Sequence, residues 1–121
     1  MFKLPKNDAK YHWTNHVGQK MLYYGLSPDR VKRVMRSPKR SEKGIAPDTI
    51  AVMQPAGTLQ KPTEVWVMYA EKKSRPNEKQ NFIGKKKVVI TAWRYPGKSP
   101  IRDQIPIPAD ILEELKREGI I

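Results

Sequence analysis

Two stretches, TEVWVMYA at Thr63–Ala70 and KVVITAWRY at Lys87–Tyr95, determine the architecture of this chain. Both are dense in β-branched and aromatic residues, which is typical of β-strands. We expect them to pair antiparallel as a hairpin. A third stretch, Thr49–Gln54, lies between Pro47 and Pro55 and predicts a shorter strand. The centre of the fold is therefore predicted to be a sheet of three or more antiparallel strands.

Helices are expected on both sides of these strands along the chain. Residues 14–24 are predicted to form a first helix. Ser27 and Pro28 then provide an N-cap and a first helical position for a second helix, which should end at Ser37. A last helix is predicted over residues 109–118. We therefore expect an α+β fold in which two N-terminal helices precede the antiparallel sheet and a C-terminal helix follows it.

The length of the chain and the positions of its prolines indicate how many domains it has and where regular structure is absent. With 121 residues, we expect a single domain over residues 1–121. Four prolines make residues 96–108 an extended strap without regular structure. Residues 39–48 are basic and rich in turn formers, and the connection 71–86 carries six lysines and arginines. That connection is expected to be a solvated, mobile tip.

Net charge is the strongest functional signal in the sequence. Lys and Arg total 24 against 12 Asp and Glu, which gives a formal charge of +12. Residues 1–98 hold 21 basic and 7 acidic side chains, a net +14, whereas residues 99–121 hold 3 and 5, a net −2. Such a field attracts phosphate backbones and releases their counterions. We therefore predict a nucleic-acid partner, with single-stranded RNA favoured, over a solubility surface or an anionic membrane.

Several classes of protein do not fit the composition. The chain has no cysteine, so neither a disulfide nor a thiolate zinc site can form, and a reducing cytoplasmic location is expected. We expect no signal peptide and no membrane span, since no apolar run has the length of either. His12 and His16 are the two histidines and have no carboxylate cluster near them. Without a glycine-rich phosphate motif either, the sequence predicts no metal and no cofactor.

Two segments resemble a known family. The stretch Thr14–Val31, with its histidine, its basic-methionine pair and its glycine-leucine-serine turn, is similar to the opening motif of a bacterial domain-of-unknown-function family related to the BrnT and RelE-like toxins. Val88–Pro96 is similar to the strand near the end of that family. The resemblance implies a RelE/BrnT-toxin-like fold, endoribonuclease activity and an acidic antitoxin as partner. It covers about residues 12–96 and leaves out the C-terminal helix.

RNA cleavage through the 2′-hydroxyl requires an acid, a base and cations that stabilise the phosphate. His16 and Lys20 are four residues apart, so the predicted first helix places them on one face, and they are the first catalytic candidates. The alternative is that His16 only hydrogen-bonds a neighbour at the start of the helix. Arg40 and Arg94 are predicted to complete the catalytic set as phosphate clamps, since arginine offers a bidentate fork. Each is alternatively an ordinary surface charge.

Further cations and two aromatic residues are predicted to bind the nucleic acid. In a regular strand Trp93 and Tyr95 lie on one side and Arg94 on the other. If the aliphatic side is buried, both rings are free to stack on unpaired bases. If Trp93 is buried, which we favour, Arg94 faces outward and contacts phosphate instead. The remaining predicted contacts are Lys43, Lys72, Lys73, Arg75, Lys85 and Lys86.

Three functional hypotheses follow. The first is a metal-independent endoribonuclease of a toxin–antitoxin system. The second is a non-catalytic nucleic-acid-binding module, and the third is a basic interaction protein that docks an acidic partner. The many cations and aromatic residues favour the first two over the third.

Overall fold

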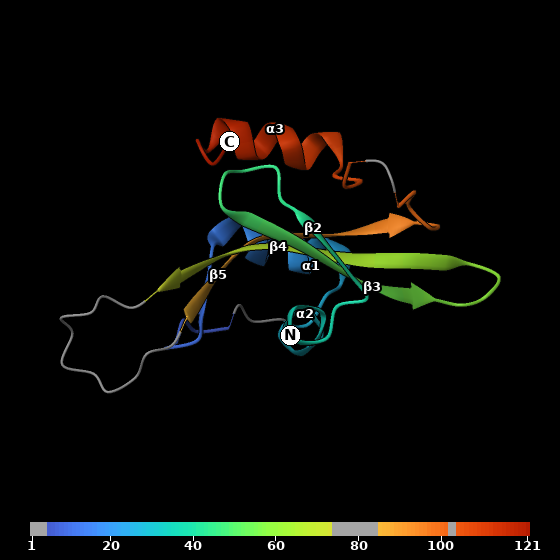
Figure 1. The fold of residues 1–121 in the computed structure, drawn as a ribbon, viewed down its shortest axis with the longest axis horizontal. Helices are drawn as coiled ribbons and strands as arrows, with labels where there is room; N and C mark the ends of the chain where they lie inside the picture. Colours follow the sequence, from blue (N-terminus) through green and yellow to red (C-terminus); the bar gives the residue numbers. More distant parts are fainter. Residues whose placement is uncertain (1–4, 74–84, 102–103) are drawn as a thin grey trace.

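The computed structural model describes residues 5–73, 85–101 and 104–121, and it has an α+β fold of three helices and a five-stranded sheet (Figure 1). In chain order the elements are β1 (Tyr11–Trp13), α1 (Asn15–Tyr24), α2 (Pro28–Arg36), β2 (Arg40–Lys43), β3 (Thr49–Gly57), β4 (Pro62–Lys73), β5 (Lys85–Pro96) and α3 (Ala109–Arg117). The predicted α+β class is therefore confirmed. The predicted order of elements differs at the start, because a strand precedes the first helix.

The sheet is mixed, with the strand order β1-β5-β4-β3-β2. The hairpin of β4 and β5 is antiparallel, as predicted, and aligns Trp66 with Trp93. The strands β2, β3 and β4 also pair antiparallel. The expectation of a purely antiparallel sheet is wrong, because β1 pairs parallel to β5 and aligns Tyr11 with Lys87.

A bulge in the central hairpin changes which side chains share a face. Met68 pairs with Thr91 but Tyr69 pairs with Val89, so one residue of β5 is left over. A strict alternation predicts Val89 and Trp93 on the same side, whereas Val89 belongs to the core under α2 and Trp93 to the core under α3. The predicted alternation is therefore wrong across this bulge, because an extra residue shifts every later side chain to the opposite face.

The first two helices begin and end where the sequence signals lie. The hydroxyl of Thr14 accepts a hydrogen bond from the backbone N–H of Val17 at 3.1 Å, and Gly25 ends α1 with a φ of 66°. The hydroxyl of Ser27 accepts from the N–H of Arg30 at 3.1 Å. Each cap satisfies backbone groups that the helix itself leaves unpaired.

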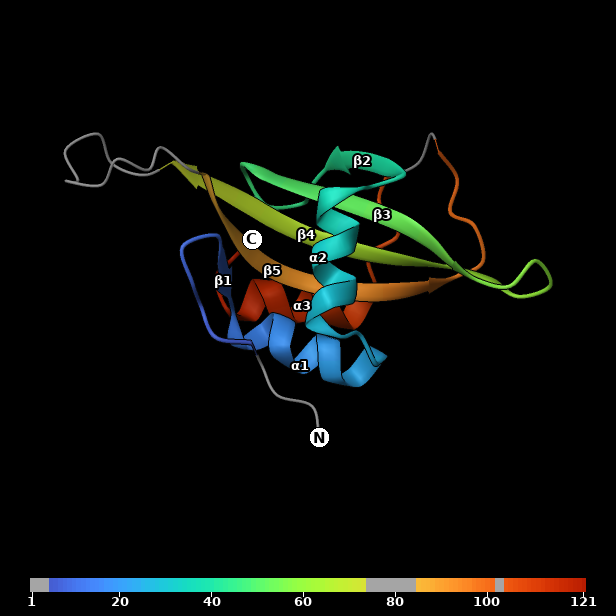
Figure 2. The same ribbon diagram turned by 90° about the horizontal axis from the view of Figure 1, so that it is seen from below.

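The sheet separates two hydrophobic cores. On one face α2 packs over a core that includes Val31, Val34 and Val65. On the other face α3 contributes Ile111 and Leu115 to a second core, which is built on the paired tryptophans of β4 and β5. Figures 1 and 2 show α2 and α3 on opposite faces of the sheet and α1 running beside β5.

The strap between β5 and α3 has no helix or strand in residues 97–101 and 104–108, in agreement with its proline content, whereas Pro96, predicted as its first residue, is the last residue of β5. Arg40 fastens it to the sheet, because its guanidinium donates to the hydroxyl of Ser99 at 3.0 Å and to the carbonyl of Pro100 at 3.1 Å. The expectation of a turn over residues 39–48 is wrong in part, because these residues include β2. This strand lies at the edge of the sheet and is only partly buried, so its sequence lacks the apolar alternation of the other strands.

Candidate functional site

The predicted catalytic pair lies together on α1 but under the C-terminal helix. His16 is 3 % exposed and Lys20 9 % exposed. The ammonium of Lys20 donates to Oε1 of Glu114 on α3 at 2.8 Å. Nδ1 of His16 lies 3.4 Å from Oε2 of Glu114 and 3.6 Å from Oε2 of Glu118. The helical spacing therefore places both side chains on one face, as predicted, and that face is covered by glutamates.

Of the two ring nitrogens of His16, Nδ1 has no hydrogen-bond partner among the described residues, whereas Nε2 has one. Nε2 lies 2.9 Å from the hydroxyl of Thr91 on β5, in a buried contact. Burial lowers the pKa of His16 below its ordinary value, with a smaller lowering from Lys20, while the carboxylates of Glu118 and Glu114 act in the opposite direction. Burial therefore favours the uncharged form of the imidazole. The geometry of His16 fits the alternative interpretation, a hydrogen-bonded structural residue, better than it fits an exposed general acid or base.

Arg40 and Arg94 do not join this pair. Arg40 lies on β2, three strand spacings from β5, which corresponds to about 14 Å. Its side chain is 10 % exposed, and Nε lies 3.2 Å from Oε1 of Glu42. Nε of Arg94 donates to the backbone carbonyl of Tyr24 at 2.8 Å. Each predicted phosphate clamp thus has an internal partner, and the four predicted catalytic residues do not converge on one point.

The predicted stacking residue Trp93 is inaccessible. It is fully buried, and its ring lies parallel to that of Trp66 with 5.9 Å between the centroids. Of the two orientations considered, the one that buries Trp93 is confirmed, and its assignment as a base-stacking residue is wrong. Arg94 does not point freely into solvent, because it is half-buried and its guanidinium binds the end of α1. Tyr95 is half-buried and packs against the same core under α3.

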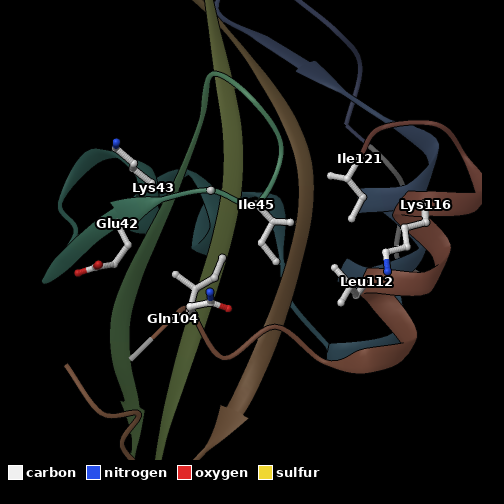
Figure 3. Close-up of a pocket in the computed structure, with 9 residues that line it drawn as sticks. Glu42, Lys43, Ile45, Gln104, Leu112, Lys116 and Ile121 are labelled. Atoms are coloured by element: carbon white, nitrogen blue, oxygen red, sulfur yellow. The ribbon is translucent and has the colours of Figure 1, made fainter. Parts of the chain in front are cut away.

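Lys43, predicted to contact nucleic acid, lies at the rim of a cavity of about 910 Å³ between the β2–β3 loop and α3. Figure 3 shows Ile45, Leu112 and Ile121 on the walls of this cavity, with Lys116 beside Leu112 and the ammonium of Lys43 directed away from them. The exposed position of Lys43 is compatible with its predicted role. The cavity itself has mainly apolar walls.

The cations predicted on the hairpin tip fall partly within the described structure. Lys72 on β4 is exposed, Lys86 on β5 is half-buried, and the two residues are aligned across the hairpin. Their alignment places two positive charges at the base of the tip. Arg75 and the side chains of Lys73 and Lys85 lie outside the described part of the chain.

A basic surface that the sequence interpretation did not single out lies on α2. We call it the α2 basic face, and its members are Arg30, Lys32, Arg33, Arg36 and Lys87. The ammonium of Lys32 lies 5.2 Å from the ring centroid of Tyr11, and that of Lys87 lies 5.7 Å from the ring centroid of Tyr69. Both tyrosines belong to the core under α2, so Lys87 of the strand and Lys32 of the helix lie on the same side of the sheet.

Among the residues that the structure describes, no carboxylate pairs with a cation of the α2 basic face. Within residues 5–73, 85–101 and 104–121, none of its five cations has a carboxylate oxygen within 4.0 Å. Lys32 of this face also acts on the carboxylate of Asp8. The pKa of Asp8 is lowered, first by the backbone N–H groups of Tyr11 and Lys10 and then by Lys32 and Lys86.

The acidic groups of α3 lie on the other face of the sheet. The helix α3 carries Asp110, Glu113 and Glu114, with Glu118 at its C-cap. Figures 1 and 2 place this helix on the side of the sheet opposite α2. The described molecule is thus positive on its α2 side and carries an acidic helix on the other side. One feature of the sequence could have indicated the α2 basic face. The nine residues of α2 include four cations around a buried stripe of Val31, Val34 and Met35.

Neither a metal centre nor a membrane-spanning helix is found in the described residues. No three potential metal ligands among them lie close enough together to hold an ion. No helix in the same part of the chain has the length and apolar character needed to cross a membrane.

Comparisons with protein-family models, with curated proteins and with solved structures gave no match for this chain. The resemblance to the BrnT and RelE-like toxins therefore stays a hypothesis, and the functional interpretation depends on the geometry of the chain itself.

Proposed function

We propose that this chain is an RNA-binding module that holds the phosphate backbone on the α2 basic face without cleaving it. The observation that carries this proposal is the set of five cations that have no carboxylate within 4.0 Å among the described residues. Cations that have no carboxylate partner can neutralise phosphates and release condensed counterions. Arginines add directed hydrogen bonds, because the guanidinium fork fits phosphate oxygens.

The burial of His16 and Lys20 favours binding over catalysis. A general base has to reach the 2′-hydroxyl of the substrate, and a general acid has to reach the departing oxygen. His16 is 3 % exposed and lies between Thr91 and the glutamates of α3. Lys20 is held by Glu114. The non-catalytic alternative is therefore the better fit to this geometry.

An acidic protein could bind the same cations as RNA, so experiment has to decide which of the two is the ligand. RNA is the first partner to test, because the family resemblance implies it and because several cations on one helix face match the repeated charges of a strand. Duplex DNA and an acidic peptide serve as competitors in the same assay. The salt dependence separates the ligands, since each phosphate contact to a single strand adds roughly 0.7 to the slope of log affinity against log salt.

The experiment compares two matched double variants. Arg33→Gln with Arg36→Gln removes two cations from the last turn of α2, and Lys116→Gln with Arg117→Gln removes two from the last turn of α3. Fluorescence anisotropy with a labelled single-stranded RNA is measured for both variants and the unchanged protein. We expect the α2 variant to lose affinity by roughly 10- to 100-fold and its salt slope to fall by about 1.4, in proportion to two lost phosphate contacts.

The α3 variant is expected to change affinity by less than about threefold, because its cations lie on the far face and act only through screened long-range attraction. Equal losses in the two variants would contradict a specific α2 interface and leave only a nonspecific charge effect. The RNA is recovered and sized in the same experiment, and it is expected to stay intact. Specific cleavage by the unchanged protein would overturn the non-catalytic proposal.

A further inference from the structure

A groove lies at the end of the sheet where β3 turns into β4. It consists of two hollows of about 490 Å³ and about 370 Å³, whose walls share Pro55, Ala56, Pro62 and Lys98. Because four residues belong to both walls, the two hollows adjoin and form one groove, which we call the β3–β4 groove. Figures 1 and 2 show the start of the strap at this same end of the sheet.

The β3–β4 groove lies on the face of the sheet that carries α3. Met53, in its wall, belongs to the core under α3. Glu64, also in its wall, is two positions from Trp66 of the same core, so its side chain points to the same side. The helix α2 covers the opposite face. A ligand of the groove is therefore additional to the proposed RNA binding and independent of it.

The buried polar groups in the wall of the groove already have partners. Glu64 is 5 % exposed, and its Oε1 accepts hydrogen bonds from Nε1 of Trp66 at 3.0 Å and from the hydroxyl of Ser99. The guanidinium of Arg40 donates to Ser99 and to two carbonyls of the strap. These bonds stabilise the wall itself. A ligand would therefore be recognised by the apolar lining and by the charges at the rim.

The accessible lining of the groove is aliphatic. Met53, Pro55 and Pro62 contribute to it. Leu59 of the β3–β4 turn borders one hollow, and Ile101 of the strap borders the other. Leu59 is fully exposed and Ile101 is 79 % exposed. Single exposed apolar side chains are ordinary on a protein surface, but two of them beside one apolar groove are typical of a protein interface.

The rim of the groove is positively charged. Lys39 and Lys98 are exposed and line the larger hollow. Among residues 5–73, 85–101 and 104–121, neither lysine has a carboxylate oxygen within 4.0 Å. The carboxylate in the wall, that of Glu64, is buried and hydrogen-bonded. A surface that carries acidic side chains around apolar ones would complement this rim.

RNA and an added β-strand fit the groove less well than protein side chains do. No aromatic ring is among the described residues that line either hollow, so unpaired bases would have none to stack on. The strand β2 pairs with β3 only as far as Met53, which leaves the edge of β3 open at Pro55. Pro55 has no backbone N–H, so this edge lacks a donor that an added strand needs.

We infer that the β3–β4 groove docks an acidic segment of a partner protein through large apolar side chains. Met53 and Gly57 are four residues apart on β3, which is about 13 Å in a strand. That length matches roughly two turns of a helix. Two turns place apolar side chains at positions i, i+3, i+4 and i+7 on one face. Acidic residues beside that face complement Lys39 and Lys98.

The test uses the full chain and a fluorescein-labelled helical peptide, with leucines at i, i+3, i+4 and i+7 and glutamates elsewhere. A second peptide has alanines in place of the leucines and keeps the charge. A third has glutamines in place of the glutamates and keeps the apolar face. By fluorescence anisotropy, we expect the first peptide to bind at least about tenfold more tightly than either of the others, because docking needs both features.

An apolar double variant tests the location of the peptide. Leu59→Ser with Ile101→Ser is expected to weaken binding of the leucine–glutamate peptide by about tenfold or more. Leu22→Ser with Tyr23→Ser, which replaces two exposed apolar side chains on α1, is the matched control and is expected to change it by less than about threefold. All four side chains are exposed, so both variants should fold, and urea denaturation checks this.

A charge double variant separates the groove from the α2 basic face. Lys39→Gln with Lys98→Gln is expected to weaken peptide binding by roughly three- to tenfold and to reduce its salt dependence. Its RNA affinity is expected to stay within about threefold, because only screened long-range attraction is lost. Arg33→Gln with Arg36→Gln is expected to show the reverse, with RNA affinity lost and peptide affinity kept. Saturating peptide should leave RNA binding unchanged.

The outcomes separate the two proposals. No binding of the leucine–glutamate peptide, equal binding of the three peptides, or equal losses in the apolar variant and its control overturns the docking groove. Competition between peptide and RNA, with the α2 variant losing both, assigns the peptide to the α2 basic face and also overturns it. Self-association of the protein alone, abolished in the apolar variant, makes a second copy the occupant and contradicts the inference. Absent RNA binding with the expected peptide results overturns the α2 interface alone.

Discussion

Lys20 on α1 and Glu114 on α3 are 94 positions apart in the chain, and their side chains meet at 2.8 Å. The Lys20 side chain is 11 % exposed and that of Glu114 is 30 % exposed. The pair therefore links the C-terminal helix to the N-terminal one at a partly desolvated point. The ion pair also fixes the side chain of Lys20, which the spacing from His16 predicts to be catalytic.

Removing one partner of this pair should destabilise the fold. We expect Glu114→Gln to lower the free energy of unfolding by about 1–2 kcal/mol, below the roughly 3–5 kcal/mol typical of fully buried pairs because the carboxylate is partly exposed. Urea denaturation measures this change. Glu113→Gln, one position earlier and exposed, is expected to alter the unfolding free energy by less than about 0.5 kcal/mol. Equal effects would mean that the ion pair contributes nothing specific.

The burial of His16 predicts an acid-sensitive fold. Its pKa is lowered in the folded state, chiefly by burial, so below its ordinary value of 6.5 the unfolded chain binds the proton more readily. The contribution of His16 to stability should be complete above that ordinary value and should fall as the pH drops towards the folded-state pKa. Thermal unfolding between about pH 8 and about pH 5 checks this. In His16→Gln, thermal stability should depend less on pH. If its dependence on pH is unchanged, other groups cause the acid sensitivity.

Trp93 should matter for stability and not for RNA binding. Because its ring is fully buried against Trp66, Trp93→Ala should lower the free energy of unfolding by about 3–5 kcal/mol. The milder Trp93→Phe keeps an aromatic ring in the core and is suited to the binding assay. We expect its RNA affinity to match that of the unchanged protein. A large loss of affinity in a folded Trp93→Phe protein would restore the stacking role predicted from the sequence.

The hydrogen bonds of Arg40 should stabilise the position of the strap on the sheet. Arg40→Ala removes the hydrogen bonds to Ser99, Pro100 and Ile101 and leaves their acceptors without this donor. We expect a loss of about 1–3 kcal/mol in unfolding free energy and faster proteolysis within residues 97–101. Lys43→Ala, on the same strand and exposed, is the control and should change neither. Slow cleavage of the strap in Arg40→Ala would show that its packing alone holds it.

The local features of the fold follow from the sequence because their causes are local. The hydroxyl caps at Thr14 and Ser27, the proline that opens α2 and the β-branched runs of β4 and β5 all act within a few residues. The spacing of His16 and Lys20 likewise guarantees that they share a helix face. The predicted ends of the three helices therefore lie close to the observed ones.

The features that sequence reasoning missed depend on contacts between distant segments. The three residues of β1 form a strand only because residues 87–89 offer a partner, and the bulge at Met68 and Tyr69 alters the facing of β5 without any mark in β5 itself. The covering of His16 by α3 joins segments from opposite ends of the chain. A histidine–lysine spacing alone therefore cannot distinguish an open catalytic face from a closed structural one.

An NMR titration of the isotope-labelled protein with a single-stranded RNA, followed through the backbone amide shifts, locates the RNA interface residue by residue. We predict that the largest changes fall on residues 29–36 of α2 and on Lys86 and Lys87 of β5, and that the amides of α3 change little. Changes concentrated on α3, or no change at low salt, would contradict an RNA interface on the α2 basic face.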